Sequence, residues 1–130
     1  MTILVAYVPR PEGQAALDKG IEMAKRRNER LVVVNASPGG SKEDPSLADV
    51  QDYERVQQLL TDSGVNGELK QFVRGKNAVE EIEALAESLQ VSVLIIGIRK
   101  RSPVGKLIMG SVAQELLLSV SCPVLAVKAA

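Results

Sequence analysis

The sequence contains no histidine and no tryptophan, and Cys122 is the only cysteine among its 130 residues. Without histidine, neither a Ser-His catalytic triad nor a histidine-ligated metal site can form. A single cysteine leaves no internal disulfide, which suits a reducing cytoplasm. Because Cys122 precedes Pro123 at the start of an apolar run, we interpret it as a small core residue rather than a nucleophile.

The chain also lacks net charge and long hydrophobic runs. Lys plus Arg and Asp plus Glu each number 16, so no overall field attracts nucleic acid or an anionic membrane. The apolar run from Met1 to Val8 has no basic leader and is too short for a signal peptide or a membrane span. We therefore expect a cytoplasmic protein with no nucleic acid and no membrane partner. The composition, 45% hydrophobic and 25% charged, predicts a single domain over residues 1–130.

Five apolar runs alternate with four amphipathic segments along the chain. Continuous apolar runs predict buried strands, and apolar residues at helical spacing predict helices. The third run alternates apolar and polar residues, which is typical of an edge strand, and the polar segment 37–46 is expected to be a loop. The strands are expected at 1–8, 31–36, 68–73, 93–96 and 123–127, and the helices at 14–27, 49–63, 77–89 and 112–119. Gly64 is expected to be the C-cap glycine of the second helix.

Strands that alternate with helices predict an α/β fold with a parallel sheet, because each parallel connection needs a crossover. Right-handed crossovers then limit the topology to a doubly wound sheet with helices on both faces. The expected order is the flavodoxin-like 3-2-1-4-5, whose switch point lies between the first and fourth strands. Ligands of such sheets bind beyond the carboxyl ends of these two strands. Ala6 to Val8, Gly97 to Lys100 and Gly110-Ser111 are expected to converge there.

A basic segment connects the fourth strand to the last helix. Gly97 ends the apolar run, Arg99, Lys100 and Arg101 follow it, and Gly110-Ser111 precede the helix. The first N–H groups of a helix have no intrahelical partner and the dipole is positive there, so an anion is favoured. Gly110 lets a ligand approach the backbone, and Ser111 adds a hydroxyl donor. The alternative is purely structural, with Ser111 as an N-cap, Gly110 as a turn residue and the basic segment solvated.

These segments resemble the universal stress protein family over nearly the whole chain. The similarity is carried by Ile3–Ala6, Leu31–Val34, Val91–Gly97 and the tail from Gly110 to Val127. Its specific part is the family's ATP signature, Gly-x2-Gly-x9-Gly-(Ser/Thr). Gly97, Gly110 and Ser111 fall on this signature, and Lys100 replaces its middle glycine. The resemblance implies an adenine nucleotide alpha hydrolase-like fold and a loop that wraps the ribose and phosphates of ATP, alone or with Mg²⁺.

The resemblance also assigns contacts and shows one that is missing. Family members that bind ATP carry an Asp at the end of the first strand, and the aligned residue here is Val8. Losing that hydrogen bond costs roughly 1.5–3 kcal/mol, part of which Arg99 and Arg101 could offset at the phosphates. Asn35 is either a ligand contact or a strand-terminating residue. The carried-over contacts are Ala6 and Tyr7 beside the base, Val8 and Asn35 at the strand ends, Ile96, Gly97, Arg99 and Lys100 along the loop, and Gly110, Ser111 and Val112 at the phosphates.

Two functions are left open by the sequence. The first is a stress-response regulatory module that binds ATP or a related adenine nucleotide. The second is a dimerising interaction protein of the same fold that binds no nucleotide. An enzyme is not expected, because the crevice has no evident general base and at most slow ATP hydrolysis follows. The resemblance and the open edge of the last strand, Val124 to Val127, both imply a homodimer formed through that strand.

Overall fold

The computed structural model describes residues 1–35, 50–71, 78–101, 106–108 and 110–129, with the backbone alone for residues 100, 101 and 106–108. The predicted loop 37–46 lies outside these residues. In chain order the elements are β1 (Thr2–Tyr7), α1 (Pro11–Arg27), β2 (Arg30–Asn35), α2 (Val50–Ser63), β3 (Gly67–Gln71), α3 (Ala78–Ser88), β4 (Val91–Arg101), β5 (Lys106–Ile108), α4 (Ser111–Ser119) and β6 (Val124–Lys128).

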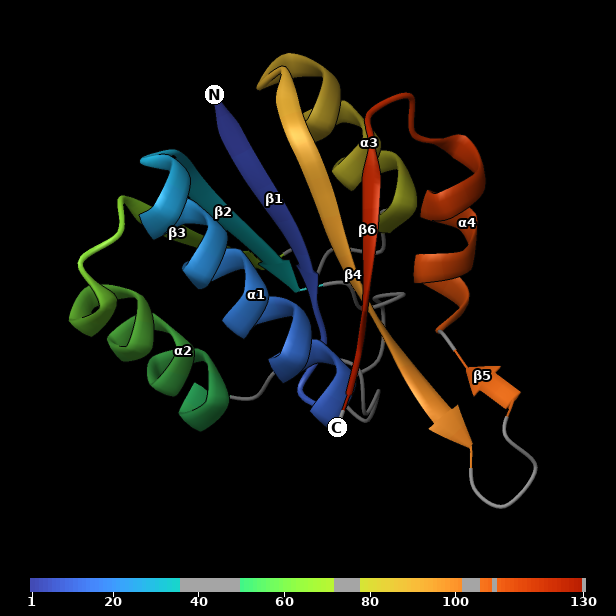
Figure 1. Cartoon of the computed structure of the whole chain (residues 1–130), viewed down its shortest axis with the longest axis horizontal. Helices are drawn as coiled ribbons and strands as arrows, with labels where there is room; N and C mark the ends of the chain where they lie inside the picture. Colours follow the sequence, from blue (N-terminus) through green and yellow to red (C-terminus); the bar gives the residue numbers. More distant parts are fainter. Residues whose placement is uncertain (36–49, 72–77, 102–105, 109, 130) are drawn as a thin grey trace.

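Five of these strands form a parallel sheet in the order β3-β2-β1-β4-β6 (Figure 1). This confirms the predicted order 3-2-1-4-5, with β6 as the fifth parallel strand. It also places β3 at an edge, as its alternating pattern predicted. β1 and β2 pair from Thr2 and Arg30 through Tyr7 and Asn35, so both strands end at the same level.

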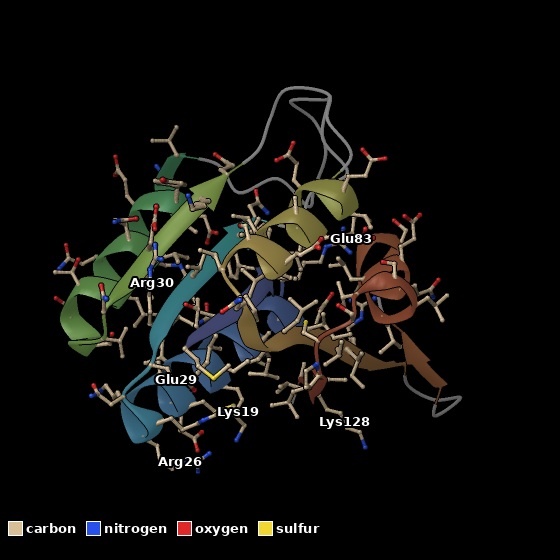
Figure 2. The ribbon with its side chains drawn as sticks, turned by 90° about the horizontal axis from the view of Figure 1, so that it is seen from above. Lys19, Arg26, Glu29, Arg30, Glu83 and Lys128 are labelled. Carbon is tan, nitrogen blue, oxygen red and sulfur yellow. The ribbon has the colours of Figure 1, made fainter. Side chains whose placement is uncertain are left out.

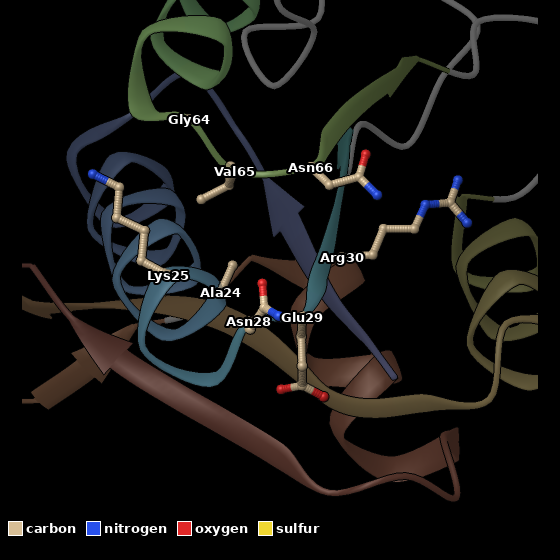
Figure 3. A pocket seen from close by; sticks show the side chains of 8 residues that line it. All are labelled: Ala24, Lys25, Asn28, Glu29, Arg30, Gly64, Val65 and Asn66. Carbon is tan, nitrogen blue, oxygen red and sulfur yellow. The ribbon is translucent and has the colours of Figure 1, made fainter.

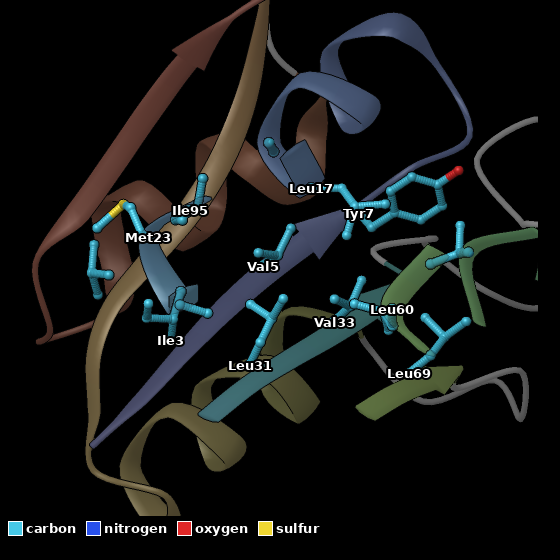
Figure 4. Close-up of a cluster of buried hydrophobic side chains, with 14 residues drawn as sticks. Ile3, Val5, Tyr7, Leu17, Met23, Leu31, Val33, Leu60, Leu69 and Ile95 are labelled. Carbon is cyan, nitrogen blue, oxygen red and sulfur yellow. The ribbon is translucent and has the colours of Figure 1, made fainter. Parts of the chain in front are cut away.

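The helices cover both faces of the sheet. Residues of β1 alternate between the faces, since successive side chains of a strand point in opposite directions. Ile3 and Val5 pack with residues of α1 and α2 in a first cluster, shown in Figure 4, whereas Leu4 and Ala6 pack with residues of α3 and α4 in a second cluster. Because both faces are buried, the central strands read as continuous apolar runs in the sequence.

The helix ends follow local chemistry. α1 begins at Pro11 rather than at Gln14, because proline at the first helical position loses no intrahelical hydrogen bond and already has a helical φ. It ends at Asn28, which adopts the left-handed conformation with φ 51° and ψ 48°. Gly64 follows α2 with φ 78°, which confirms it as the predicted C-cap glycine.

β4 is longer than predicted, and Gly97 does not end it. The strand continues to Arg101 and forms an antiparallel hairpin with β5, in which Arg99 pairs with Ile108 and Lys100 with Leu107. The sequence analysis expected a basic loop here because charged residues interrupt the apolar pattern. A hairpin is held by backbone hydrogen bonds, which do not depend on apolar side chains. The turn between β4 and β5 lies outside the described residues.

Candidate functional site

β1 and β4 separate at their carboxyl ends. Their pairing reaches Val5 on β1 and Ile95 on β4. Beyond this point β1 pairs with β2 to Tyr7, and β4 continues beside β6 and β5. In a doubly wound sheet, a switch point of this kind opens a crevice in which ligands bind. The structure therefore has its topological switch point at the edge of the sheet where the sequence predicts the site.

The first turn of α1 packs against this switch point. A Cβ on Gly97 would overlap the carbonyl oxygen of Glu12, and a Cβ on Gly13 would overlap the carbonyl oxygen of Val8. The two glycines therefore allow the backbone of α1 to approach both β1 and β4 closely. Gly97 thus has a packing role within the chain, which the sequence analysis did not consider when it assigned this glycine to a phosphate loop.

Glu12 is buried at the same place. The residue is 8% exposed, and its Oε2 atom has no hydrogen-bond partner in the described part of the chain. Its position in the first turn of α1 places the carboxylate at the positive end of the helix dipole, which stabilises a negative charge. The sequence does not predict Glu12 as a site residue, because the helix is expected to begin at Gln14 and Glu12 then falls in the preceding connection.

The predicted site residues lie on opposite faces of the sheet. Ala6, Val8, Ile96 and Val112 pack with the second cluster, on the side of α3 and α4. Tyr7 packs in the first cluster, on the side of α1 and α2. The side chain of Tyr7 is thus committed to the core, so only its backbone lies at the crevice.

The hydroxyl of Tyr7 joins a polar network with α1 and α2. It donates to Asp52 Oδ2 at 2.6 Å and accepts from Arg55 Nη2 at 3.1 Å. The same Arg55 nitrogen donates to Asp52 Oδ1 at 3.0 Å and to Gln14 Oε1 at 2.9 Å. Burial, and next the hydrogen bond to Asp52, raise the pKa of Tyr7 above its ordinary value of 10.0. The phenol therefore stays protonated as a donor.

Asn35 ties the strand ends together. The residue is 1% exposed, its Nδ2 donates to the Tyr7 carbonyl at 3.1 Å, and its Oδ1 accepts from Gln71 Nε2 at 3.0 Å. The ends of β1, β2 and β3 are therefore linked by side-chain amides in addition to the sheet ladder. The sequence left two interpretations of Asn35 open, a ligand contact or a strand-terminating residue. The structure shows that its side chain connects three strands.

The start of α4 is exposed. Gly110 is the N-cap residue, with φ −64° and ψ 161°, and no side chain among the described residues caps the helix. A Cβ on Gly110 would meet no described atom within 4 Å, so neither its backbone angles nor its described neighbours require glycine. Ser111 is the first helical residue and is exposed, so the alternative that it serves as the N-cap is wrong. Arg99 is also exposed, on the hairpin.

Comparison with known proteins shows which family has this sequence and fold. The model of the universal stress protein family matches residues 1–128. The chain belongs to the universal stress protein family. A universal stress protein from Mycolicibacterium smegmatis (strain ATCC 700084 / mc(2)155) is 48% identical over 126 residues, which cover 97% of this chain and 96% of that protein.

Solved structures of family members show the same fold. A universal stress protein from Archaeoglobus fulgidus has a TM-score of 0.76 and 30% identity, covering 98% of this chain and 97% of that one. The universal stress protein from Archaeoglobus fulgidus in complex with dAMP has a TM-score of 0.70 and 22% identity, covering 98% and 96%. The resemblance to the universal stress protein family, which the sequence shows over nearly the whole chain, is therefore confirmed.

Two pockets in the described part of the chain lie away from the crevice. The larger, of about 320 Å³, lies where α1 and α2 end, and its lining includes Lys25, Arg30 and Asn66. Figure 3 shows that the charged ends of Lys25 and Arg30 point away from one another, so they do not converge on a ligand. The smaller lies at the ends of α3 and α4.

The described residues contain no group of three or more His, Cys, Asp or Glu side chains placed to hold a metal ion. None of their helices has the length and apolar character needed to cross a membrane. The sequence does not predict the polar residues that contact the ends of β1, β2 and β4, directly or through a neighbouring side chain, which are Glu12, Gln14, Asp52, Arg55 and Gln71. Their sequence neighbourhoods carry no motif, so only the fold reveals these contacts.

Proposed function

We propose that this chain is a cytoplasmic regulatory module of the stress response that binds an adenine nucleotide in the crevice beyond β1 and β4. The observation that carries the proposal is the open start of α4 at Gly110. The N–H groups of the first helical turn and the positive end of the dipole favour a phosphate there. The family member in complex with dAMP supports an adenine nucleotide as the ligand class. ATP, alone or with Mg²⁺, is the form that the sequence signature predicts.

The proposed contacts combine backbone and side-chain groups. Gly110, Ser111 and Val112 hold the phosphates through their N–H groups, and the Ser111 hydroxyl adds a donor. Arg99 and Lys100, on the hairpin, supply positive charge. Ala6, Tyr7 and Val8 contribute the end of β1 beside the nucleoside. Asn35, Ile96 and Gly97 complete the set, with Asn35 holding the strand ends in register.

The proposed role is regulatory rather than catalytic. Nucleotide binding would set the conformation or the choice of partner, and Glu12, the buried carboxylate at the switch point, is given a packing role rather than a catalytic one. A second candidate is a dimerising interaction protein of the same fold that binds no nucleotide. It is favoured by the apolar Val8 side chain, which packs with the second cluster and supplies no acceptor for a ribose hydroxyl.

The first test is direct. We expect freshly purified protein to release an adenine nucleotide on denaturation, or to bind one when AMP, cAMP, ATP and ATP with Mg²⁺ are titrated calorimetrically. Gly110→Val should weaken that binding about tenfold or more, equivalent to roughly 1.4 kcal/mol, because its side chain occupies the phosphate position. Its free energy of unfolding should fall by no more than about 1 kcal/mol, because valine is a poorer N-cap than glycine but its Cβ meets no described atom within 4 Å. If no nucleotide binds at millimolar concentration, the nucleotide proposal is wrong and the second candidate, a dimerising interaction protein, takes its place.

A further inference from the structure

The surface formed by α3 and α4 carries acidic residues and no basic ones. The two helices lie side by side on one face of the sheet (Figure 1). Neither helix contains Lys or Arg, whereas α3 contains four glutamates and α4 one. Among the described residues, no ion pair involves Glu83, Glu87 or Glu115. Charge on this face is therefore not balanced by the helices that carry it.

Two of these glutamates are placed unfavourably for the isolated chain. Glu83 and Glu87 are four residues apart on α3, so their carboxylates are neighbours on the helix surface and repel each other. Glu87 also stands in the last turn of α3, where the negative end of the helix dipole disfavours an acidic side chain. A positive group bound beside this pair would relieve both interactions. Figure 2 shows Glu83 on the side of α3 that faces α4.

A pocket of about 90 Å³ lies beside this pair, where both helices end. Carbonyl groups at helix C-termini carry partial negative charge and have no intrahelical partner, so two such ends add to the negative potential. The Ser119 hydroxyl donates to the Glu115 carbonyl at 2.7 Å, which leaves its oxygen free to accept a hydrogen bond. The lining residues are Glu83, Ala86, Glu87, Ser119, Val120, Ser121 and Cys122.

The lining of the pocket suits a basic side chain. Ala86 and Val120 provide apolar contacts for an alkyl stem, and Glu83 and Glu87 provide acceptors for a charged head. A metal ion does not fit, because the described residues hold no cluster of three or more metal-binding side chains. The same helix α4 exposes Leu117 at 46% and Leu118 at 87%, which offers apolar contacts to a larger partner but not to a small free cation.

We propose that the α3–α4 surface docks a basic segment of a protein partner, whose Lys or Arg side chain enters this pocket. The pocket lies at the end of α4 opposite to Gly110, so the partner and a nucleotide at the proposed crevice occupy opposite ends of the same helix. The docking surface does not depend on nucleotide binding. It depends on charge complementarity with Glu83 and Glu87, supported by apolar contact along α4.

The proposal is tested by NMR titration of the full chain with the peptide acetyl-Leu-Lys-Leu-Arg-Leu-amide. We expect saturable shifts of the Ala86, Val120 and Cys122 amides. The double variant Glu83→Gln/Glu87→Gln should weaken binding about tenfold or more, the scale of a charge-assisted hydrogen bond. The control Glu80→Gln/Glu115→Gln removes equal charge from the same helices outside the pocket lining, and should have a smaller effect. The urea midpoint of the pocket variant should not fall, because a repulsion is removed.

Four results would overturn the proposal. The first is no shift at millimolar peptide. The second is an equal loss of affinity in both double variants, which would reflect only the general negative field. The third is equal binding of spermidine, or of a peptide with Gln in place of Lys and Arg, which would point to a free cation or to apolar contact alone. The last is peptide-independent self-association that the pocket variant abolishes, which would assign the surface to a second copy of this chain.

Discussion

At the scale of single residues, Val8 is the position at which the proposed nucleoside contact differs from that of ATP-binding family members. Its side chain packs with the second core cluster, and its carbonyl oxygen accepts the Arg10 N–H at 2.8 Å. The position is half-buried, at the end of β1 beside the crevice. The family resemblance places an Asp here in ATP-binding members, so Val8 lacks the acceptor that such a residue presents to a ligand.

The variant Val8→Asp should therefore strengthen nucleotide binding while weakening the free protein. A new hydrogen bond to a charged acceptor is expected to add about 1–3 kcal/mol to ATP affinity. A carboxylate against the apolar second cluster should lower the free energy of unfolding without ligand. Calorimetric titration measures the first effect and urea unfolding the second, with Val8→Asn as a control of similar size and no charge. Unchanged ATP affinity together with lower stability would contradict the hypothesis that position 8 belongs to a nucleoside site that lacks its acceptor.

Tyr7 is expected to make the free energy of unfolding fall as the pH rises in the alkaline range. Its pKa is raised in the folded chain, so its contribution is fully present below the unfolded value of 10.0 and is lost as the pH rises above it. Tyr7→Phe should remove this loss and lower stability at neutral pH by about 1–3 kcal/mol, because the hydrogen bonds to Asp52 and Arg55 are absent. Urea unfolding between pH 7 and about pH 11 measures the stability at neutral pH and its loss at alkaline pH. The control Tyr53→Phe removes a weaker hydrogen bond, to the Leu69 carbonyl at 3.3 Å, and an equal pH dependence in both variants would disprove the assignment.

The β4–β5 hairpin is the element that most alters the expected site. A backbone ladder holds Arg99, Lys100 and Arg101 in extended conformation, so position 100 does not need the conformational freedom that a glycine there would supply in a loop. This permits Lys100 where the family signature has glycine. The hairpin also places positive charge on a paired strand rather than on an open loop.

Neutralising this hairpin should affect binding and leave stability nearly unchanged. The variant Arg99→Gln/Arg101→Gln is expected to weaken nucleotide binding and to flatten its salt dependence, because screened phosphate contacts are lost. Exposed charges contribute little to folding, so the urea midpoint should hold. Lys25→Gln/Arg26→Gln, at the far end of α1, is the matched control. If both variants bind with equal affinity at every salt concentration, Arg99 and Arg101 do not contact the phosphates and are only solvated surface charges.

At the scale of the whole molecule, β6 leaves one edge of the sheet open in the described part of the chain. Its residues Val124, Leu125 and Val127 are half-buried, and Ala126 is exposed. Hydrogen bonds from Leu94 to the Pro123 carbonyl and from Ala129 to the Ile98 carbonyl set the alternation of the β4–β6 ladder. By this alternation Leu125 bonds β4, and the N–H of Ala126 points outward. An outward ladder of this kind is available to a second copy.

We predict a homodimer formed through β6, and Ala126→Pro should convert it to a monomer. Proline removes the outward donor but spares the ladder to β4, so the fold should survive. Leu125→Pro removes a donor to β4 and should lower stability instead. Light scattering at high micromolar concentration measures the mass, and circular dichroism checks the fold. A monomeric parent chain, or a dimeric Ala126→Pro variant, would rule out this interface.

The sequence by itself determined the five parallel strands, the four helices, the order of the strands in the sheet and the family. Continuous apolar runs such as Ile3–Tyr7 and Leu31–Val34 could only be strands buried on both faces, and their alternation with helices required crossovers. Gly64 as a helix cap followed from local conformational preference alone. These features depend on neighbours along the chain, which the sequence contains directly.

Only the tertiary structure decided what surrounds the candidate site. Gly97 is glycine because the Glu12 carbonyl lies against it, and Tyr7 is held by Asp52, which is 45 residues away. The pairing of Arg99 with Ile108 likewise joins residues whose side chains show no strand pattern. Contacts of this kind arise when distant segments pack, and backbone pairing and close approach leave no periodicity in the sequence. The carboxyl edge of the sheet could be located from the sequence, but the groups that line it could not.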